Sequence, residues 1–156
     1  MLYIKQKVFT IGDKFSIYDV NGNEMYTVQG EVFTLGKRLH LYDTIGNELA
    51  YIEQKLFNFL PTYDVYVRGM HICQVIKKVV FFSQSYDVVG LDWQISGDFF
   101  AHNYDITKNG ALIASVNKEW FTLGDSYKIS FGHGVDTIAA LAVVLVIDAC
   151  IDSSKD

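Results

Sequence analysis

The residues best suited to bind a ligand are two pairs of adjacent basic side chains in the first half of the sequence. They are Lys37 with Arg38 and Lys77 with Lys78. Ammonium and guanidinium groups hold phosphate through charge and hydrogen bonds. We therefore predict that these four residues form a basic patch for anionic phospholipid headgroups, with an ordinary solvated surface as the alternative. Other basic side chains expected near this patch are Lys5, Lys7, His40, Lys55 and Arg68.

One segment contains oxygen-bearing side chains of the kind that bind calcium: Asp19, Asn21, Asn23 and Glu24. An EF-hand loop, however, needs glycine at its sixth position and glutamate at its twelfth. Counted from Asp19, Gly22 is fourth and Gly30 is twelfth. A β-hairpin turn explains the segment better than a calcium site.

His71 and Cys73 are the best candidates for zinc ligands. Residues two apart on a strand face the same side, so together they would offer two ligands. A tetrahedral site needs four ligands, and the sequence has no second close pair. The histidines recur every 31 residues, which we interpret as chance because the sequence repeat has a different period: His40, His71, His102 and His133. We predict no metal and no cofactor.

The sequence lacks the motifs of the common enzyme classes. It has no Gly-x-Ser-x-Gly elbow, no Walker loop and no Gly-x-Gly-x-x-Gly run. Isolated serine, histidine and aspartate residues occur in any protein of this size. We predict a non-enzymatic protein, with an enzyme acting on a small molecule as an alternative.

Charge narrows the class of partner. The 156-residue chain has a net charge of −5, whereas nucleic-acid binding requires a basic face, so no nucleic-acid partner is expected. Residues 1–78 hold nine Lys/Arg and eight Asp/Glu, while residues 79–156 hold four and ten. A local basic patch is therefore still possible in the first half of the chain.

The cysteines and the N-terminal sequence indicate the cellular compartment in which the protein is expected. Cys73 and Cys150 are far apart and form no recognisable spacing, so we expect two reduced, buried thiols rather than a disulfide. The first residues, MLYIKQKVF, lack the apolar core of a signal peptide. We predict a cytoplasmic protein.

An internal repeat indicates the elements that position these residues. Three segments align at a spacing of 24 residues, which places Phe9, Phe33 and Phe57 in equivalent positions, and Phe81 continues the series. Repeats this short normally correspond to one supersecondary unit used several times. The alternation of Phe15 and Ile17 with polar neighbours is typical of strands with one buried face.

Turn residues separate the predicted strands. Hairpin turns are predicted at 19–24, 43–48 and 108–110, where Asp, Asn and Gly suit tight turns. Roughly ten to twelve strands are too many for a flat sheet in a chain of this size. We therefore predict a mainly β protein that is a closed antiparallel β-barrel of about twelve strands.

The C-terminal segment, GHGVDTIAALAVVLVIDACIDSSKD, is predicted to form a helix that begins after an N-cap at Asp136. Its uncharged run, 137–147, has 11 residues, about half of the ~20 that cross a bilayer, so we expect no transmembrane span. The run leaves no polar face, which places the helix in the centre of the barrel. The chain is then one domain, 1–152, with a polar tail, 153–156.

The sequence also resembles a known family. The residues that carry the likeness are Phe9, Gly12, Asp13, Lys14, Phe15, Ile17, Asp19, Gly22, Asn23, Tyr26, Val28 and Gly30. This run resembles the opening of LURP-one-related proteins, which include the bacterial YxjI-like proteins, and the likeness extends over nearly the whole chain. The resemblance implies the tubby C-terminal-like fold, a closed β-barrel around a central hydrophobic helix.

Proteins related to that family suggest two classes of function. Tubby proteins bind phosphoinositides, and phospholipid scramblases act on membranes, but no motif carries their functional residues onto this chain. One class is a non-enzymatic binding or scaffold protein for anionic phospholipid headgroups or a protein partner. The other is a scramblase-like protein whose helix inserts into lipid. We favour the first class because the apolar helix is needed inside the barrel.

Overall fold

The computed structural model describes residues 1–5, 14–80, 83–121 and 124–154. These residues form twelve strands followed by one helix. The elements are β1 (Leu2–Lys5), β2 (Lys14–Tyr18), β3 (Glu24–Gly30), β4 (Arg38–Tyr42), β5 (Glu48–Gln54), β6 (Thr62–Val67), β7 (Met70–Val80), β8 (Ser83–Val89), β9 (Gln94–Asp98), β10 (Asn103–Lys108), β11 (Ala111–Phe121), β12 (Gly124–Phe131) and α1 (Thr137–Ser154).

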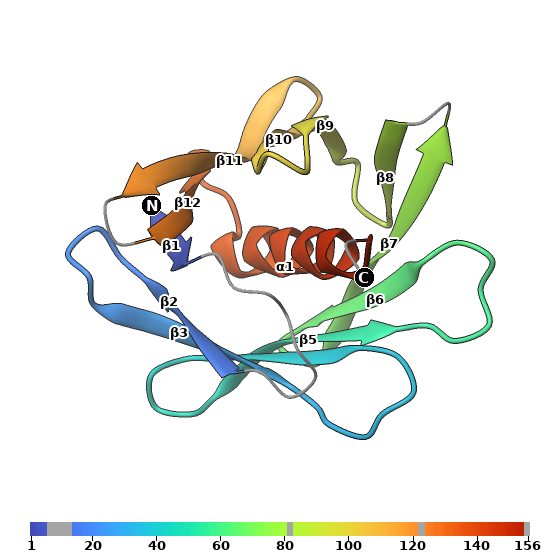
Figure 1. Ribbon diagram of the computed structural model, residues 1–156, viewed down its shortest axis with the longest axis horizontal. Helices are drawn as coiled ribbons and strands as arrows, with labels where there is room; N and C mark the ends of the chain where they lie inside the picture. The colour runs from blue at the N-terminus through green and yellow to red at the C-terminus, as the bar shows by residue number, and fades with distance from the viewer. Residues whose placement is uncertain (6–13, 81–82, 122–123, 155–156) are drawn as a thin grey trace.

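The strands form one antiparallel sheet that curves around α1 (Figure 1). Its order is β8-β7-β6-β5-β4-β3-β2-β1-β12-β11-β10-β9, so β1 pairs with both β2 and β12. The two edge strands approach each other at an isolated bridge between Val88 and Trp93. The predicted twelve-stranded barrel around a C-terminal helix is therefore confirmed, and its closure is weakest between β8 and β9.

Period-two patterning produces the wall of the barrel. Phe15 and Ile17 are buried on β2, and Leu39 and Leu41 are buried on β4, as the alternation predicts. The hairpin turn between β2 and β3 is also confirmed. Asp19 Oδ1 accepts hydrogen bonds of 2.9 Å from two backbone amides of that turn, and Asp43 repeats the arrangement between β4 and β5.

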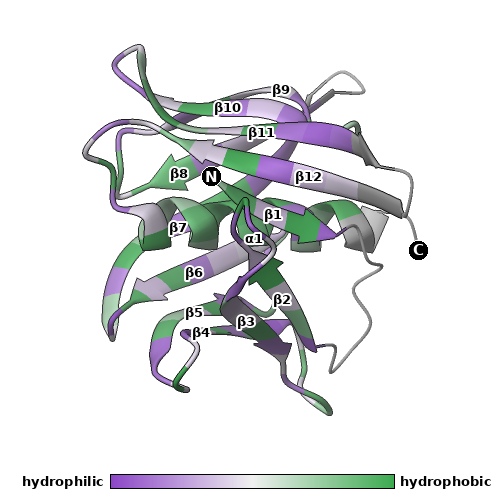
Figure 2. Ribbon diagram, turned by 90° about the vertical axis from the view of Figure 1, so that its left-hand side faces the viewer, coloured by the Kyte–Doolittle hydropathy of each residue, from purple (hydrophilic) through white to green (hydrophobic). Residues whose placement is uncertain are grey.

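The helix fills the barrel. Asp136 Oδ1 accepts hydrogen bonds from the amides of Ile138 and Ala139 at 3.1 and 3.2 Å, which confirms the predicted N-cap. From Ile138 to Ile151 no side chain is more than 6% exposed, and Figure 2 shows a largely hydrophobic helix within the ring of strands. The helix extends into the predicted polar tail, through Ser154. Nowhere in the described part of the chain is a helix both long enough and apolar enough to cross a membrane.

Candidate functional site

The structure does not bring the four residues of the predicted basic patch onto one surface. Neighbouring residues on a strand point to opposite faces, and on β7 the buried series is Cys73, Val75 and Lys77. Lys77 is only 8% exposed, so its predicted place on a solvated surface is wrong. Lys78 lies on the outer face, where its ammonium pairs with Asp87.

The inward-facing lysines lie near the C-terminal end of α1. Lys37 Nζ donates a 2.7 Å hydrogen bond to the carbonyl oxygen of Ala149. Burial raises the pKa of the Cys150 thiol to about 11, while the positive charges of Lys77 and Lys37 act to lower it. Cations there complement the negative end of the helix dipole. Lys37 and Lys77 therefore stabilise the central helix.

The outward-facing basic residues have acidic neighbours. Arg38 lies 4.0 Å from Glu31 and 3.6 Å from Glu53. Of the other basic residues expected near the patch, Lys55 pairs with Asp64, Arg68 with Asp136, and His40 with Glu31 and Glu48, while Lys5 lies over the ring of Tyr18. Lys7 lies outside the described residues. The outer face that the structure describes is thus a mixture of both charges.

The predicted side-by-side placement of His71 and Cys73 is also wrong. A β-bulge shifts the register, so Tyr66 pairs with His71 but Val65 pairs with Cys73, and one extra residue lies between them. His71 consequently faces outward and binds Asp64 at 2.8 Å, while Cys73 faces the core. Among the described residues, no three His, Cys, Asp or Glu side chains are grouped in a way that could hold a metal ion.

Two loops at one end of the barrel carry fully exposed aromatic side chains. We call residues 31–37, between β3 and β4, and 55–61, between β5 and β6, the phenylalanine loops. The exposed fractions of Phe33, Phe57 and Phe59 are 101%, 101% and 102%. Both loops extend from the end of the barrel toward which α1 runs (Figure 1). Val32, Leu35 and Leu56 are exposed beside them.

Local contacts hold the two loops together. The amide of Gln54 donates to the carbonyl of Lys37 at 2.8 Å, and the Gln54 side chain accepts from the amide of Lys37 at 3.0 Å. Gly36 has a φ of +80°, and a Cβ there would lie 3.0 Å from Leu56 Cδ2. Glycine suits this backbone conformation, and any larger residue here would have to displace the Leu56 side chain.

Two of the exposed aromatic residues have an unusual backbone. Phe33 has a φ of 59° and Phe57 a φ of 63°, and these are equivalent positions of the sequence repeat. A bulky side chain in the left-handed region costs about 1–2 kcal/mol. Phe9 and Phe81, the other members of the series, lie outside the described residues.

A polar pocket of about 570 Å³ lies beside the phenylalanine loops. Its lining consists of Leu35, Arg38, Glu53, Gln54, Lys55, Leu56, Asn58, Asp64 and Tyr66. Burial opposes ionisation of Asp64, but hydrogen bonds from His71 and Gln74 outweigh it and lower the pKa of this carboxyl. The pocket therefore combines two cations and two carboxylates behind an apolar rim.

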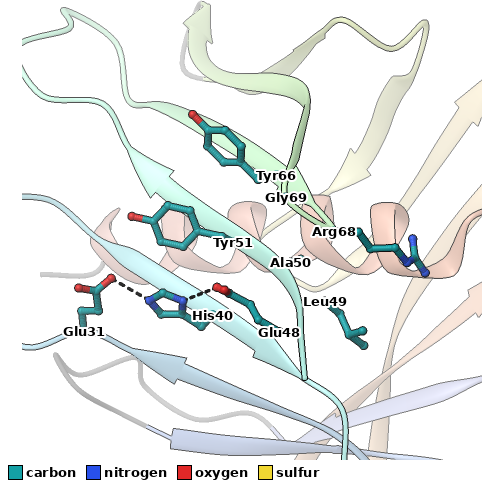
Figure 3. A pocket seen from close by; sticks show the side chains of 9 residues that line it. All are labelled: Glu31, His40, Glu48, Leu49, Ala50, Tyr51, Tyr66, Arg68 and Gly69. Atoms are coloured by element: carbon teal, nitrogen blue, oxygen red, sulfur yellow. Dashed lines mark hydrogen bonds and ion pairs between the residues drawn. The ribbon is translucent and has the colours of Figure 1, made fainter. Parts of the chain in front are cut away.

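A second groove, of about 420 Å³, lies on the outer face of β4, β5 and β6 (Figure 3). His40 stands between two carboxylates, with Nε2 2.7 Å from Glu31 and Nδ1 2.5 Å from Glu48. Burial acts to lower the pKa of His40, but these two partners outweigh it and raise the pKa. A histidine that donates through both nitrogens has no lone pair for a metal or a proton. This arrangement is a cross-link between strands rather than a catalytic base.

Asp148 and His102 form a polar pair inside the barrel. Asp148 on α1 and His102, after β9, are both buried, with Oδ1 and Nδ1 3.7 Å apart. The His102 ring stacks on Tyr127 with centroids 4.7 Å apart. The aspartate that ends the apolar run of the helix is thus placed against a buried imidazole.

Comparison with known proteins identifies the family. The family model described as LURP-one-related matches residues 1–148. The chain belongs to the LURP-one-related family. It is 36% identical over 155 residues to a Bacillus subtilis protein described as uncharacterized protein YxjI, covering 99% of this chain and 96% of that one.

A solved structure shows a similar fold. An X-ray structure of a protein from Arabidopsis thaliana matches with a TM-score of 0.64 and 19% sequence identity, over 93% of this chain and 88% of that one. At that identity the match supports the fold only. The predicted membership of the LURP-one-related family is confirmed, together with the barrel that it implies.

Sequence reasoning did not identify the phenylalanine loops as a surface feature of this LURP-one-related chain. The repeat marked Phe33 and Phe57 as equivalent but gave no direction for their side chains. A usable signal was present, because strand alternation stops at Gly30 and resumes at Arg38. Apolar residues in such a gap, next to a glycine, are expected in an exposed loop.

Proposed function

We propose that this protein is a non-enzymatic binding protein that associates with phospholipid membranes through the phenylalanine loops. The observation that carries the proposal is the full exposure of Phe33, Phe57 and Phe59 at one end of the barrel. Large exposed apolar groups gathered in one place commonly mark a binding surface. The proposal includes the cytoplasmic location expected from the sequence, so the membrane would be approached from that side.

The energetics support insertion. Burying one phenylalanine side chain is worth about 1.5–3 kcal/mol, so three would supply roughly 5–9 kcal/mol. Membrane association by a single acyl chain is similarly weak and reversible. The left-handed backbone at Phe33 and Phe57 is strain of the kind that persists at functional sites.

The shape of the surface favours a bilayer over a protein partner. Protein interfaces have a packed apolar centre with a polar rim. Here the apolar groups are separate aromatic side chains on two loops, and the pocket beside those loops is polar and contains Arg38 and Lys55. Such an arrangement suits an interface in which aromatic rings enter the lipid while polar groups stay among the headgroups.

The scramblase-like alternative requires a different movement. Insertion of α1 into lipid would remove from the barrel a helix whose side chains between Ile138 and Ile151 are at most 6% exposed. That would expose the whole inner face of the sheet. Membrane contact through the loops leaves the core intact and is the simpler mechanism.

Co-sedimentation with vesicles tests the proposal. The vesicles contain phosphatidylcholine, phosphatidylethanolamine and phosphatidylglycerol, so that binding does not depend on one headgroup. We expect the wild type to bind and the double variant Phe33→Ser, Phe57→Ser to bind at least about tenfold more weakly, which corresponds to ~1.4 kcal/mol.

The matched control removes two exposed apolar residues from the opposite end of the barrel. Val20 and Ile45 lie in hairpin turns and are 62% and 82% exposed, and Val20→Ser with Ile45→Ser should bind as the wild type does. A wild type that binds no vesicle would refute membrane association and favour a protein partner. An equal loss of vesicle binding in the two double variants would refute the role of the phenylalanine loops.

A further inference from the structure

The polar pocket beside the phenylalanine loops is lined by two cations and two carboxylates that form two ion pairs. Arg38 Nη2 lies 3.6 Å from Glu53 Oε1, and Lys55 Nζ lies 3.6 Å from Asp64 Oδ2. All four of these residues line the pocket. A ligand in this space therefore meets both cations and carboxylates.

These ion pairs leave hydrogen-bonding capacity for a ligand. Direct N–H···O bonds are about 2.7–3.2 Å long, so contacts of 3.6 Å are electrostatic without being hydrogen bonds. The Nε atom of Arg38 is buried and has no hydrogen-bond partner among the described residues. Buried donors are normally paired, so this N–H is available to donate a hydrogen bond to an oxygen atom of a ligand.

We propose that the pocket binds the phosphoethanolamine headgroup of a membrane lipid. This inference rests on the proposed function, because the headgroup reaches the pocket only when the phenylalanine loops enter the bilayer. Arg38 and Lys55 hold the phosphate, and Glu53 and Asp64 hold the ammonium group. Leu35 and Leu56, on the rim, contact the upper part of the acyl chains.

Charge balance distinguishes this headgroup from the anionic headgroups predicted from the sequence. An anionic headgroup without an ammonium group would compete with Glu53 and Asp64 for Arg38 and Lys55, and it would add negative charge beside the two carboxylates. A zwitterionic headgroup matches both signs. Of the inner lysines, Lys37 donates to the carbonyl of Ala149 on the helix and Lys77 is only 8% exposed, and neither of them lines the pocket.

The aromatic content of the pocket distinguishes ethanolamine from choline. Quaternary ammonium groups are recognised mainly by cages of aromatic rings. The lining of this pocket includes one ring, that of Tyr66, and two carboxylates. A primary ammonium donates three hydrogen bonds, which the carboxylates and the amide oxygen of Asn58 can accept.

Vesicles of three compositions test this inference: phosphatidylcholine alone, an equal mixture with phosphatidylethanolamine, and an equal mixture with phosphatidylglycerol. The first two carry no net charge, so a difference between them reports the headgroup and not general electrostatics. We expect at least about fivefold tighter binding to the ethanolamine mixture than to phosphatidylcholine alone, and no comparable gain with phosphatidylglycerol.

Glu53→Gln should reduce the ratio of the two affinities to about one. The matched control is Glu119→Gln, which makes the same charge change at a glutamate paired with Lys128 on another part of the barrel, and it should keep the wild-type ratio. Equal affinity of the wild type for choline and ethanolamine vesicles, or a gain with phosphatidylglycerol alone, would overturn the inference while leaving membrane binding intact. Absence of binding to every vesicle would instead reject the proposed function itself.

Discussion

Phe57 and Phe59 project from the same loop with equal exposure, but only Phe57 has a left-handed backbone, with a φ of 63°. Neither side chain packs against the protein, so a substitution to glycine removes no core contact. At Phe57 glycine also relieves the strained backbone. Phe57→Gly is therefore expected to raise the free energy of unfolding by about 1 kcal/mol, measured by urea denaturation.

Phe59→Gly is the matched control for that prediction. It removes an equally exposed ring where φ is not positive, so glycine adds only flexibility to the unfolded chain and lowers stability by about 0.5–1 kcal/mol. If the two variants change stability in the same direction and by the same amount, backbone strain at Phe57 is not significant.

Lys77 and Lys78 should respond very differently to the same substitution. Lys77→Glu places a carboxylate in the barrel near the negative end of α1 and is expected to destabilise by about 3 kcal/mol. Lys78→Glu changes an exposed pair with Asp87 and should cost less than about 1 kcal/mol. Thermal unfolding of both variants measures the difference, and similar melting temperatures would mean that Lys77 does not face the interior.

The elements that the sequence predicted correctly are those specified by local patterns. Phe15 and Ile17 alternate with polar residues, and Asp19 and Asp43 begin equivalent turns, so the strands and hairpins follow from nearby residues alone. The central position of α1 follows from its lack of a polar face.

The residues whose positions were predicted wrongly depend on structural features that a local sequence pattern does not contain. The bulge beside His71 moves Cys73 to the other face of the strand. The spacing of the two residues in the sequence does not predict this bulge. Adjacency groups Lys77 with Lys78, although the alternation of Cys73, Val75 and Lys77 predicts that Lys77 faces inward, as the structure shows. The pocket beside the phenylalanine loops joins β4, β5, β6 and both loops, and that proximity exists only after the barrel has formed.

His40 should make stability depend on pH. Burial acts to lower its pKa, but Glu48 and Glu31 outweigh burial and raise it above the ordinary value of 6.5. A raised folded-state pKa gives stabilisation that is complete below the unfolded-state pKa and is lost as pH rises through the folded-state value. His40→Gln should therefore destabilise more at pH 6 than at pH 9, measured by urea midpoints. An equal effect at both values would contradict the ionic role.

The two native thiols should be unreactive in the folded protein. Burial, with a smaller contribution from the charge of Asp64, raises the pKa of Cys73 to about 12; burial raises that of Cys150 to about 11. Since the thiolate is the reactive form, Ellman's reagent should modify neither until guanidinium unfolds the chain. Phe57→Cys provides the control, because a thiol on the exposed loop should react at once. Rapid modification of the wild type in native buffer would show that the barrel opens.

The most direct measurement uses that unreactive background to place a single probe on the loop. Phe57→Cys is labelled with an environment-sensitive fluorophore and mixed with vesicles that contain phosphatidylethanolamine, while Ile45→Cys, in an exposed turn at the opposite end, carries the same label as a control. Insertion of the phenylalanine loops predicts a blue-shifted, brighter emission for the label at position 57 and no change at position 45. No shift at position 57, or equal shifts at both positions, would contradict the central claim that this end of the barrel enters the membrane.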